Sequence, residues 1–123
     1  MNSKNSPKLL FVYNAESGLM NDMLDLIQKN FFPSTYTCNL CRLTYNTIGM
    51  RSEWKRFIKT LNLEVEFFHK DEFIRTYFQE SILLPAAYMI QDSKISLFLS
   101  RSEINSVTTL DELIKLVRAK IWW

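Results

Sequence analysis

The sequence predicts one α/β domain over residues 1–123, with a central four-stranded mixed sheet, flanking helices and a cysteine-containing insert at about residues 33–51, after the first helix. A length of 123 residues is enough for a single core but not for two. Short apolar runs typical of strands alternate with segments whose apolar residues recur at helical spacing. Near the C-terminus, two strand-like runs are separated by only two residues, which indicates an antiparallel hairpin.

The first elements are a buried strand and a helix. Lys8 to Tyr13 is short, apolar and rich in β-formers, as is typical of a strand buried on both faces. Asn14 to Gly18 then turns the chain, and Ser17 is a suitable helix N-cap. From Leu19 the apolar residues follow a helical period until Pro33, which cannot continue a helix.

Beyond the insert, the pattern predicts a helix, a strand and a second helix. Ser52 is the expected cap of the first helix, and Asp71 is the expected cap of the second, which runs through Phe78. Between them, Leu63 to Phe68 alternates as a strand does. The apolar face of the first helix consists of Trp54, Phe57, Ile58 and Leu61, and is most simply core.

The last third predicts the hairpin and a closing helix. Ala86 to Gln91 and Lys94 to Leu99 are strand-like and flank Asp92-Ser93, a two-residue turn without the preferred glycine. Thr109 and Glu112 have the spacing of a capping box, which opens a helix that continues to Ile121.

Composition excludes several classes of function. The chain is 47% hydrophobic and 23% charged, with a formal charge of +2, so no basic surface for nucleic acid is expected. No apolar run approaches the ~20 residues needed to cross a bilayer, and no secretory signal is visible, so we expect a cytoplasmic protein without membrane partners. In a reducing cytoplasm, a C-x-x-C pair is more often redox-active or metal-binding than a permanent crosslink.

The insert carries both cysteines, Cys38 and Cys41, and three interpretations of the pair stay open. It could be a thiol-disulfide redox pair that acts on a thiol or protein partner. It could be half of a metal site, most simply zinc, which His69 and a further ligand, or a second pair in a homodimer, would complete. It could also be structural. Two glycines in the whole chain argue against a phosphate-binding loop.

His69 follows a predicted strand directly, at the end where α/β proteins tend to place their sites. The simpler interpretation is an ion pair with Asp71 or Glu72 rather than a ligand or acid-base role. Likewise Glu16 and Ser17, in the turn after the first strand, are more simply capping residues than chemical ones.

The order of elements, a β-α-β crossover followed by a hairpin and a final helix, resembles the thioredoxin-like fold over about residues 8–32 and 52–121. Pro85 stands directly before the third strand, where that fold carries a cis-proline beside its active turn. The resemblance implies a cis Leu84–Pro85 bond packed against the turn that holds Asn14, Glu16 and Ser17. Thioredoxins carry their C-x-x-C in that turn, whereas here it lies beyond the first helix, so acidification of Cys38 by that helix does not carry over.

A second resemblance is to a family of small, uncharacterised bacterial proteins. It rests on Tyr13 to Gly18, Ser34 to Thr44, Gly49-Met50, Trp54 and Phe68 to Phe73, and it implies no activity. The leading hypothesis is therefore thiol-disulfide exchange or redox sensing through Cys38 and Cys41. The alternative is a non-enzymatic metal-binding or protein-interaction module that adds His69, and whether the protein is an enzyme stays open.

Overall fold

The computed structural model describes residues 7–14, 38–46, 49–77 and 83–121. The predicted helix between Leu19 and Pro33, together with Glu16 and Ser17, lies outside the described residues. None of the helices in the described ranges is long and apolar enough to cross a membrane.

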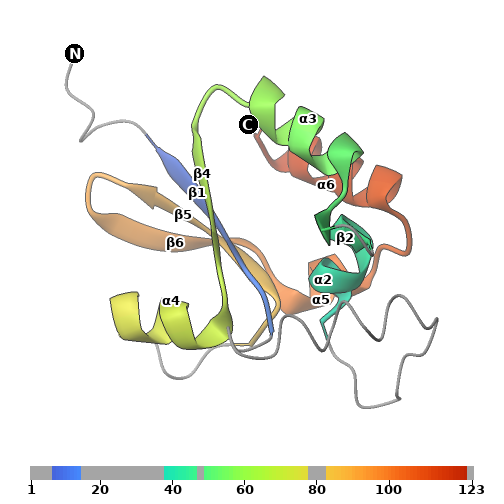
Figure 1. Ribbon diagram of the computed structural model, residues 1–123. Helices are drawn as coiled ribbons and strands as arrows, with labels where there is room; N and C mark the ends of the chain where they lie inside the picture. Colours follow the sequence, from blue (N-terminus) through green and yellow to red (C-terminus); the bar gives the residue numbers. More distant parts are fainter. Residues whose placement is uncertain (1–6, 15–37, 47–48, 78–82, 122–123) are drawn as a thin grey trace.

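A four-stranded sheet organises the molecule (Figure 1). Its order is β4 (Glu64–Phe68), β1 (Lys8–Val12), β5 (Ala86–Gln91) and β6 (Lys94–Leu99). The β1 and β4 strands are parallel, while β5 is antiparallel to both β1 and β6. The predicted mixed sheet, with a crossover followed by a hairpin, is confirmed.

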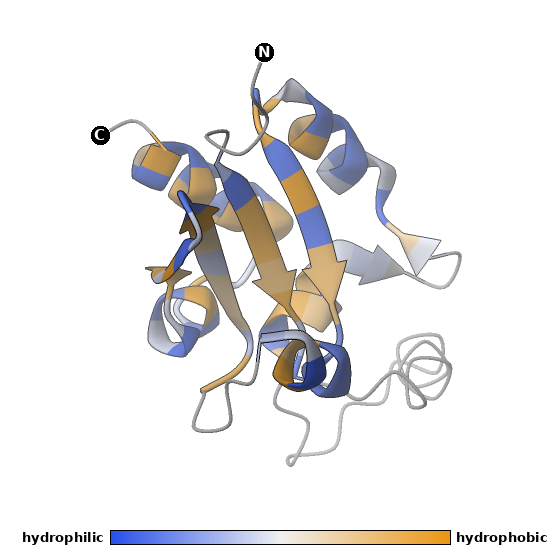
Figure 2. Cartoon of the chain, turned by 90° about the vertical axis from the view of Figure 1, so that its left-hand side faces the viewer, coloured by the Kyte–Doolittle hydropathy of each residue, from blue (hydrophilic) through white to orange (hydrophobic). Residues whose placement is uncertain are grey.

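The central strand β1 is apolar and buried on both faces, as predicted. Leu9, Leu10, Phe11 and Val12 are each 0% exposed. Figure 2 shows β1 apolar along most of its length beside β4, where polar and apolar residues alternate. Because side chains alternate across a strand, Leu9 and Phe11 join one core cluster and Leu10 and Val12 join the other.

Helices cover both faces of this sheet (Figure 1). The larger cluster packs under α2 (Asn39–Thr44), α3 (Ser52–Thr60), α5 (Arg101–Asn105) and α6 (Leu110–Ile121). The smaller cluster packs under α4 (Lys70–Tyr77). The predicted apolar face of α3 is confirmed as core, since Trp54 and Phe57 are buried while Ile58 and Leu61 pack against them.

Two predicted helix caps are wrong. Arg51 occupies the N-cap position of α3, and Ser52 is already the first helical residue. Helix α4 begins at Lys70 rather than after Asp71. There, the Glu72 carboxylate reaches back three residues and accepts the backbone N–H of His69 at 2.9 Å. Glu72 therefore satisfies the exposed donor at this helix start, and Asp71 lies within the first turn.

The C-terminal hairpin is confirmed, and its turn uses two residues with positive φ. Asp92 and Ser93 have φ of 54° and 66°, the combination that a type I′ turn requires. Its strands pair Gln91 with Lys94, so the two-residue connection is as predicted.

The start of α6 uses a shifted version of the predicted capping box. Thr109 Oγ1 accepts the N–H of Glu112 at 3.2 Å, but the Glu112 carboxylate accepts the N–H of Thr108, at 2.7 Å, rather than that of Thr109. The short helix α5 was not expected from the sequence. Ser100 and Glu103 form a complete capping box at its start.

The Leu84–Pro85 peptide bond is cis, as predicted. Pro85 is buried and precedes Ala86, which pairs with Val12 at the carboxyl end of β1. Of the turn against which Pro85 was expected to pack, only Asn14 belongs to the described residues.

The described part of the insert is regular structure. After α2 it forms a small antiparallel ribbon of β2 (Tyr45–Asn46) and β3 (Gly49–Met50). Gly49 has a φ of 138°, a backbone conformation that residues with a Cβ rarely adopt. The insert thus returns the chain to α3 on the same side of the sheet as α2.

Candidate functional site

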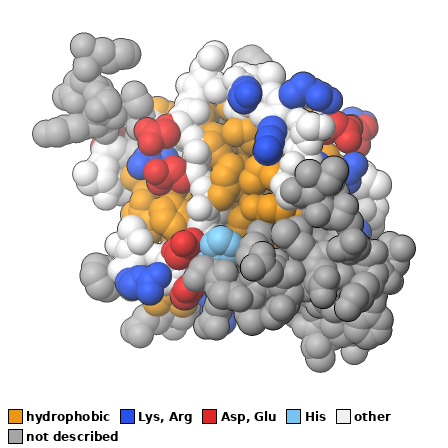
Figure 3. Space-filling view, in the orientation of Figure 1, with side chains coloured by type: hydrophobic (Ala, Val, Ile, Leu, Met, Phe, Trp, Pro, Cys, Tyr) orange, Lys and Arg blue, Asp and Glu red, His pale blue; other side chains and the backbone are white. Residues whose placement is uncertain are grey.

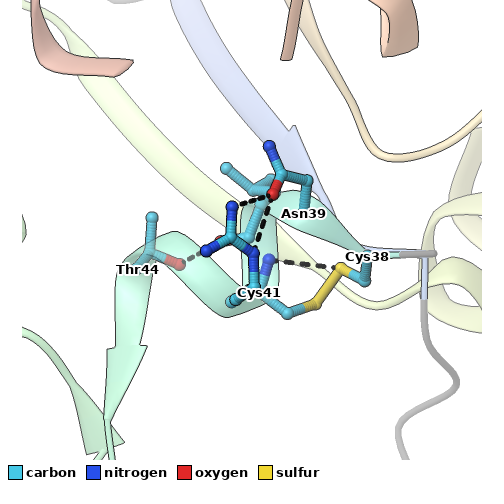
Figure 4. Close-up of a disulfide and its surroundings, with 6 residues drawn as sticks. Cys38, Asn39, Cys41 and Thr44 are labelled. Atoms are coloured by element: carbon cyan, nitrogen blue, oxygen red, sulfur yellow. Dashed lines mark hydrogen bonds between the residues drawn. A yellow bond between two sulfur atoms is a disulfide. The ribbon is translucent and has the colours of Figure 1, made fainter. Parts of the chain in front are cut away.

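The two cysteines lie at the start of α2 and form a disulfide, with an S–S distance of 2.02 Å (Figure 4). Cys38 is the N-cap residue, and Cys41 lies in the first turn of the helix. The Cys41 N–H donates to Cys38 Sγ at 3.2 Å. The helix start at Cys38 thus belongs to the insert itself and not to the first predicted helix, which thioredoxins use.

Both cysteines are buried in the larger core cluster. Cys38 is 2% exposed and Cys41 1% exposed, and Leu40 between them is fully buried. A reagent can therefore reach either sulfur atom only after a local opening around the start of α2.

Asn39, the other residue between the cysteines, anchors α2 to α5. Its Nδ2 donates to the carbonyl oxygens of Ile104 and Val107 at 2.8 and 3.0 Å. Its Oδ1 accepts two hydrogen bonds from the Arg42 guanidinium, at 3.0 and 2.6 Å. The C-x-x-C segment is thus held on a fixed part of the fold, although Asn39 was not predicted to matter.

His69 pairs with Glu72, one of the two partners predicted for it. His69 Nδ1 lies 2.8 Å from Glu72 Oε1, across the start of α4. The His69 backbone N–H, followed by its side chain, lowers the pKa of Glu72 below its usual range. With a carboxylate at Nδ1, the neutral imidazole carries its proton there and leaves Nε2 as an acceptor.

Tyr13 brings the end of β1 into contact with His69 and with the insert. Its ring centroid lies 5.9 Å from that of His69 and 5.5 Å from that of Tyr45. Burial raises the pKa of Tyr13 well above its ordinary value, and Tyr45 adds to the effect, so the hydroxyl stays protonated. Tyr13 was not predicted as a site residue, and the signal that could have identified it is its place as the last residue of the predicted strand Lys8 to Tyr13, at the end where α/β proteins tend to place their sites.

The remaining predicted site residues are not gathered into one centre. Among the described residues, no three His, Cys, Asp or Glu side chains come together in a way that could hold a metal ion, so Cys38, Cys41 and His69 do not form such a group. Asn14 follows Tyr13 at the end of β1, and Pro85 lies beside the same end of the strand.

Two shallow depressions are formed by other residues than the cysteines. One of about 510 Å³ lies between β4 and α4, lined by Phe67, Glu72 and Arg75 among others. The second, of about 390 Å³, is lined by Arg42, Arg51 and the start of α6. Neither is lined by a cysteine, so neither gives direct access to the sulfur atoms.

Comparisons of the chain with protein-family models, with curated proteins and with solved structures found no match. The resemblances to thioredoxins and to a small bacterial family therefore rest on the sequence motifs and on the arrangement of the sheet alone.

Proposed function

We propose that this protein is a thioredoxin-like α/β domain whose Cys38–Cys41 pair cycles between a disulfide and two thiols, either in catalysis or as a redox sensor. Support for this comes from the chain's only two cysteines, which lie at bonding distance in the first turn of one helix. The strand order and the cis bond before Pro85 agree with the fold that the resemblance implies.

The observation that carries the proposal is the hydrogen bond from the Cys41 N–H to Cys38 Sγ, at 3.2 Å. A backbone donor at a helix start stabilises a thiolate more than a thiol, so it favours the reactive form of Cys38 after reduction. The bond lies within one helical turn, so it can persist when the disulfide opens. Arg42 lies in the same helix, and its guanidinium is hydrogen-bonded to the Asn39 amide. Because that amide is uncharged, it does not neutralise the guanidinium, whose positive charge favours a thiolate in this turn.

The reaction balances with thiols as the only co-reactant. A first thiolate attacks one sulfur of the disulfide, and the other sulfur leaves as a thiolate that takes up a proton. A second thiol then attacks the mixed disulfide, so two substrate thiols become one disulfide and Cys38 and Cys41 become thiols. We propose a small thiol or a protein dithiol as the partner, in a reducing cytoplasm, and no metal is needed.

The test is an equilibrium titration of the folded protein in glutathione buffers of graded redox potential, with thiols trapped by alkylation and counted by mass spectrometry. We expect one transition in which both cysteines react together. Cys38→Ser and Cys41→Ser should each abolish it and leave one thiol that reacts at every potential.

The burial of the cysteines makes the test decisive. A structural disulfide would stay oxidised, or its thiols unreactive, until denaturant unfolds the protein, and that result would overturn the proposal. Circular dichroism of each variant shows whether it is still folded at the potentials used.

A further inference from the structure

One edge of the sheet carries open backbone hydrogen-bonding groups. The sheet ends at β4, and no strand in the described ranges pairs with the outer side of that strand. The Phe68 carbonyl accepts the Tyr13 N–H at 2.9 Å, so the backbone groups of Phe68 point toward β1. Because these groups alternate between the two sides of a strand, the N–H and C=O of Val65 and Phe67 point outward. An added strand can pair with them.

A shallow groove of about 510 Å³ runs along this open edge. It is lined by residues 65–68 of β4 and by Glu72, Arg75 and Thr76 of α4. The α4 residues are spaced by three and four positions, so they lie on one face of that helix. An exposed sheet edge is where extended peptides bind as an added strand, and here α4 forms the second wall of the groove.

The two sides of the edge differ in chemistry. Val65 and Phe67 point to the face that α3 covers, where they pack against the larger core cluster. Figure 3 shows apolar side chains gathered between β4 and α3. Glu66 points to the opposite face and lines the groove together with Glu72. An added strand therefore sets every second side chain on an apolar surface and the others beside carboxylates.

The groove and its ion-pair partners carry an excess of negative charge. The groove is lined by two carboxylates and one guanidinium. That guanidinium, of Arg75, lies 3.9 Å from the Asp71 carboxylate, which offsets its charge. Lys8 is shared between Glu64 and Glu66, at 3.6 and 3.4 Å, so two carboxylates face a single ammonium group. The α4 side of the edge therefore favours lysine or arginine side chains and disfavours acidic ones.

We propose that the β4 edge binds an extended peptide in which apolar residues alternate with lysine or arginine. The peptide backbone pairs with Val65 and Phe67, and its apolar side chains pack on the face toward α3. Its basic side chains lie in the groove beside Glu66 and Glu72. This protein-interaction function goes beyond the redox proposal and does not depend on it.

The test is a fluorescence anisotropy titration of the folded protein with a short labelled peptide of alternating valine and lysine, blocked at both ends. We expect saturable binding. Binding should be weaker by about tenfold or more when glutamate replaces lysine, and also when the same valines and lysines are grouped in two blocks.

Substitutions in the groove test its charge. Glu66→Gln and Glu72→Gln should each weaken binding of the alternating peptide about two- to fivefold. Asp92→Asn is the matched control, because it removes an exposed carboxylate in the hairpin turn, where asparagine also adopts the positive φ. This variant should bind as the wild type does.

Amide hydrogen exchange tests whether the peptide adds to the sheet. The N–H groups of Val65 and Phe67 should exchange slower by about tenfold or more with the peptide bound. Those of Glu66 and Phe68, which face β1, should change much less. Val65→Pro removes one outward N–H without loss of a bond to β1 and should weaken binding by about tenfold or more.

Should Val65→Pro fail to fold, N-methylation of the peptide replaces it, once on the valines and once on the lysines. Since only every second N–H of an added strand faces β4, one of these peptides must lose binding and the other must retain most of it.

The inference is wrong if the alternating peptide does not bind below about 1 mM, or if the alternating and block peptides bind equally. It is also wrong if the Val65 and Phe67 amides are protected without peptide and the protein sediments as a dimer, since a second copy then occupies the edge. None of these outcomes affects the glutathione titration, which tests the redox proposal separately.

Discussion

Asn39 and Ile104 are joined by a hydrogen bond of 2.8 Å, from a side chain inside the C-x-x-C segment to the main chain of α5. A second bond, to the carbonyl of Val107, uses the other amide proton of Asn39. The Ile104 carbonyl lies in the last turn of α5, where it also accepts the Val107 N–H at 3.4 Å, and the Val107 carbonyl lies just beyond that helix, so Asn39 adds two hydrogen bonds to the end of α5 from α2. The segment that carries Cys38 and Cys41 is thereby hydrogen-bonded directly to the C-terminal part of the fold.

Asn39→Ala should lower the free energy of unfolding by about 1–3 kcal/mol, since it leaves two carbonyls and the Arg42 guanidinium without these bonds. Urea denaturation followed by circular dichroism measures the change. Asn105→Ala removes the same amide from an exposed site on α5 and should cost less than about 0.5 kcal/mol. Equal effects of the two substitutions would show that the bonds of Asn39 contribute no net stability.

Reduction of the disulfide should leave the fold intact. The two cysteines are three positions apart in the sequence, so the crosslink removes little entropy from the unfolded chain. We expect dithiothreitol to lower the free energy of unfolding by no more than about 2 kcal/mol, as measured in urea. Loss of structure on reduction alone would mean that the disulfide is essential for folding.

Glu103 should contribute stability at neutral pH that is lost in acid. Its carboxylate accepts a bond of 2.7 Å from Lys120, which is the main cause of its lowered pKa, and one from the Ser100 N–H. A carboxylate whose pKa is lower in the folded state stabilises the fold above its unfolded pKa of about 4.3, and this contribution disappears as pH falls through the folded value.

The stability difference between wild type and Glu103→Gln should accordingly be largest near pH 7 and shrink below about pH 4.3, in urea titrations across the pH range. Glu53→Gln, which breaks an exposed pair with Arg51 at 3.2 Å, is the control and should change stability by less than about 1 kcal/mol. A difference for Glu103→Gln that does not vary with pH would contradict the prediction.

Purified protein should contain no stoichiometric zinc or iron, because the proposed exchange takes place between sulfur atoms. Elemental analysis before and after treatment with a chelator measures this. Zinc near one equivalent per chain, removed by Cys41→Ser, would instead favour the metal-binding alternative. A parallel measurement on His69→Ala would show whether the imidazole is a ligand.

Much of the sheet could be predicted from local patterns. The buried run of β1, the alternation of β4 and the two-residue spacing of the hairpin each reflect side-chain burial within a few residues. Pro85 was singled out because the order of elements resembles the thioredoxin-like fold, and the cis Leu84–Pro85 bond agrees with that resemblance. The pairing of His69 with Glu72 was likewise predictable, since three residues separate them across a helix start.

Helix caps and the interior of the insert were less predictable. Ser52 and Asp71 have the residue types of caps, but Arg51 occupies the N-cap position of α3 without a side-chain cap bond, and Glu72, within the first turn of α4, accepts the His69 N–H. Residue type therefore does not fix the exact residue at which a helix begins. Helix α2 has only six residues, and such a short helix is not stable without tertiary contacts. Asn39 supplies one of these contacts from a residue 65 positions away from its partner.

From its sequence alone, the chain specifies the α/β pattern, the strands and the spacing of Cys38 and Cys41, because each of these depends on local burial and on covalent distance. Other features depend on contacts between segments far apart in the chain. These are the burial of the two cysteines, the helix that acts on them, and the contacts of Tyr13 with both His69 and Tyr45. Such contacts form when apolar faces are removed from water together, and no local pattern states which faces will meet.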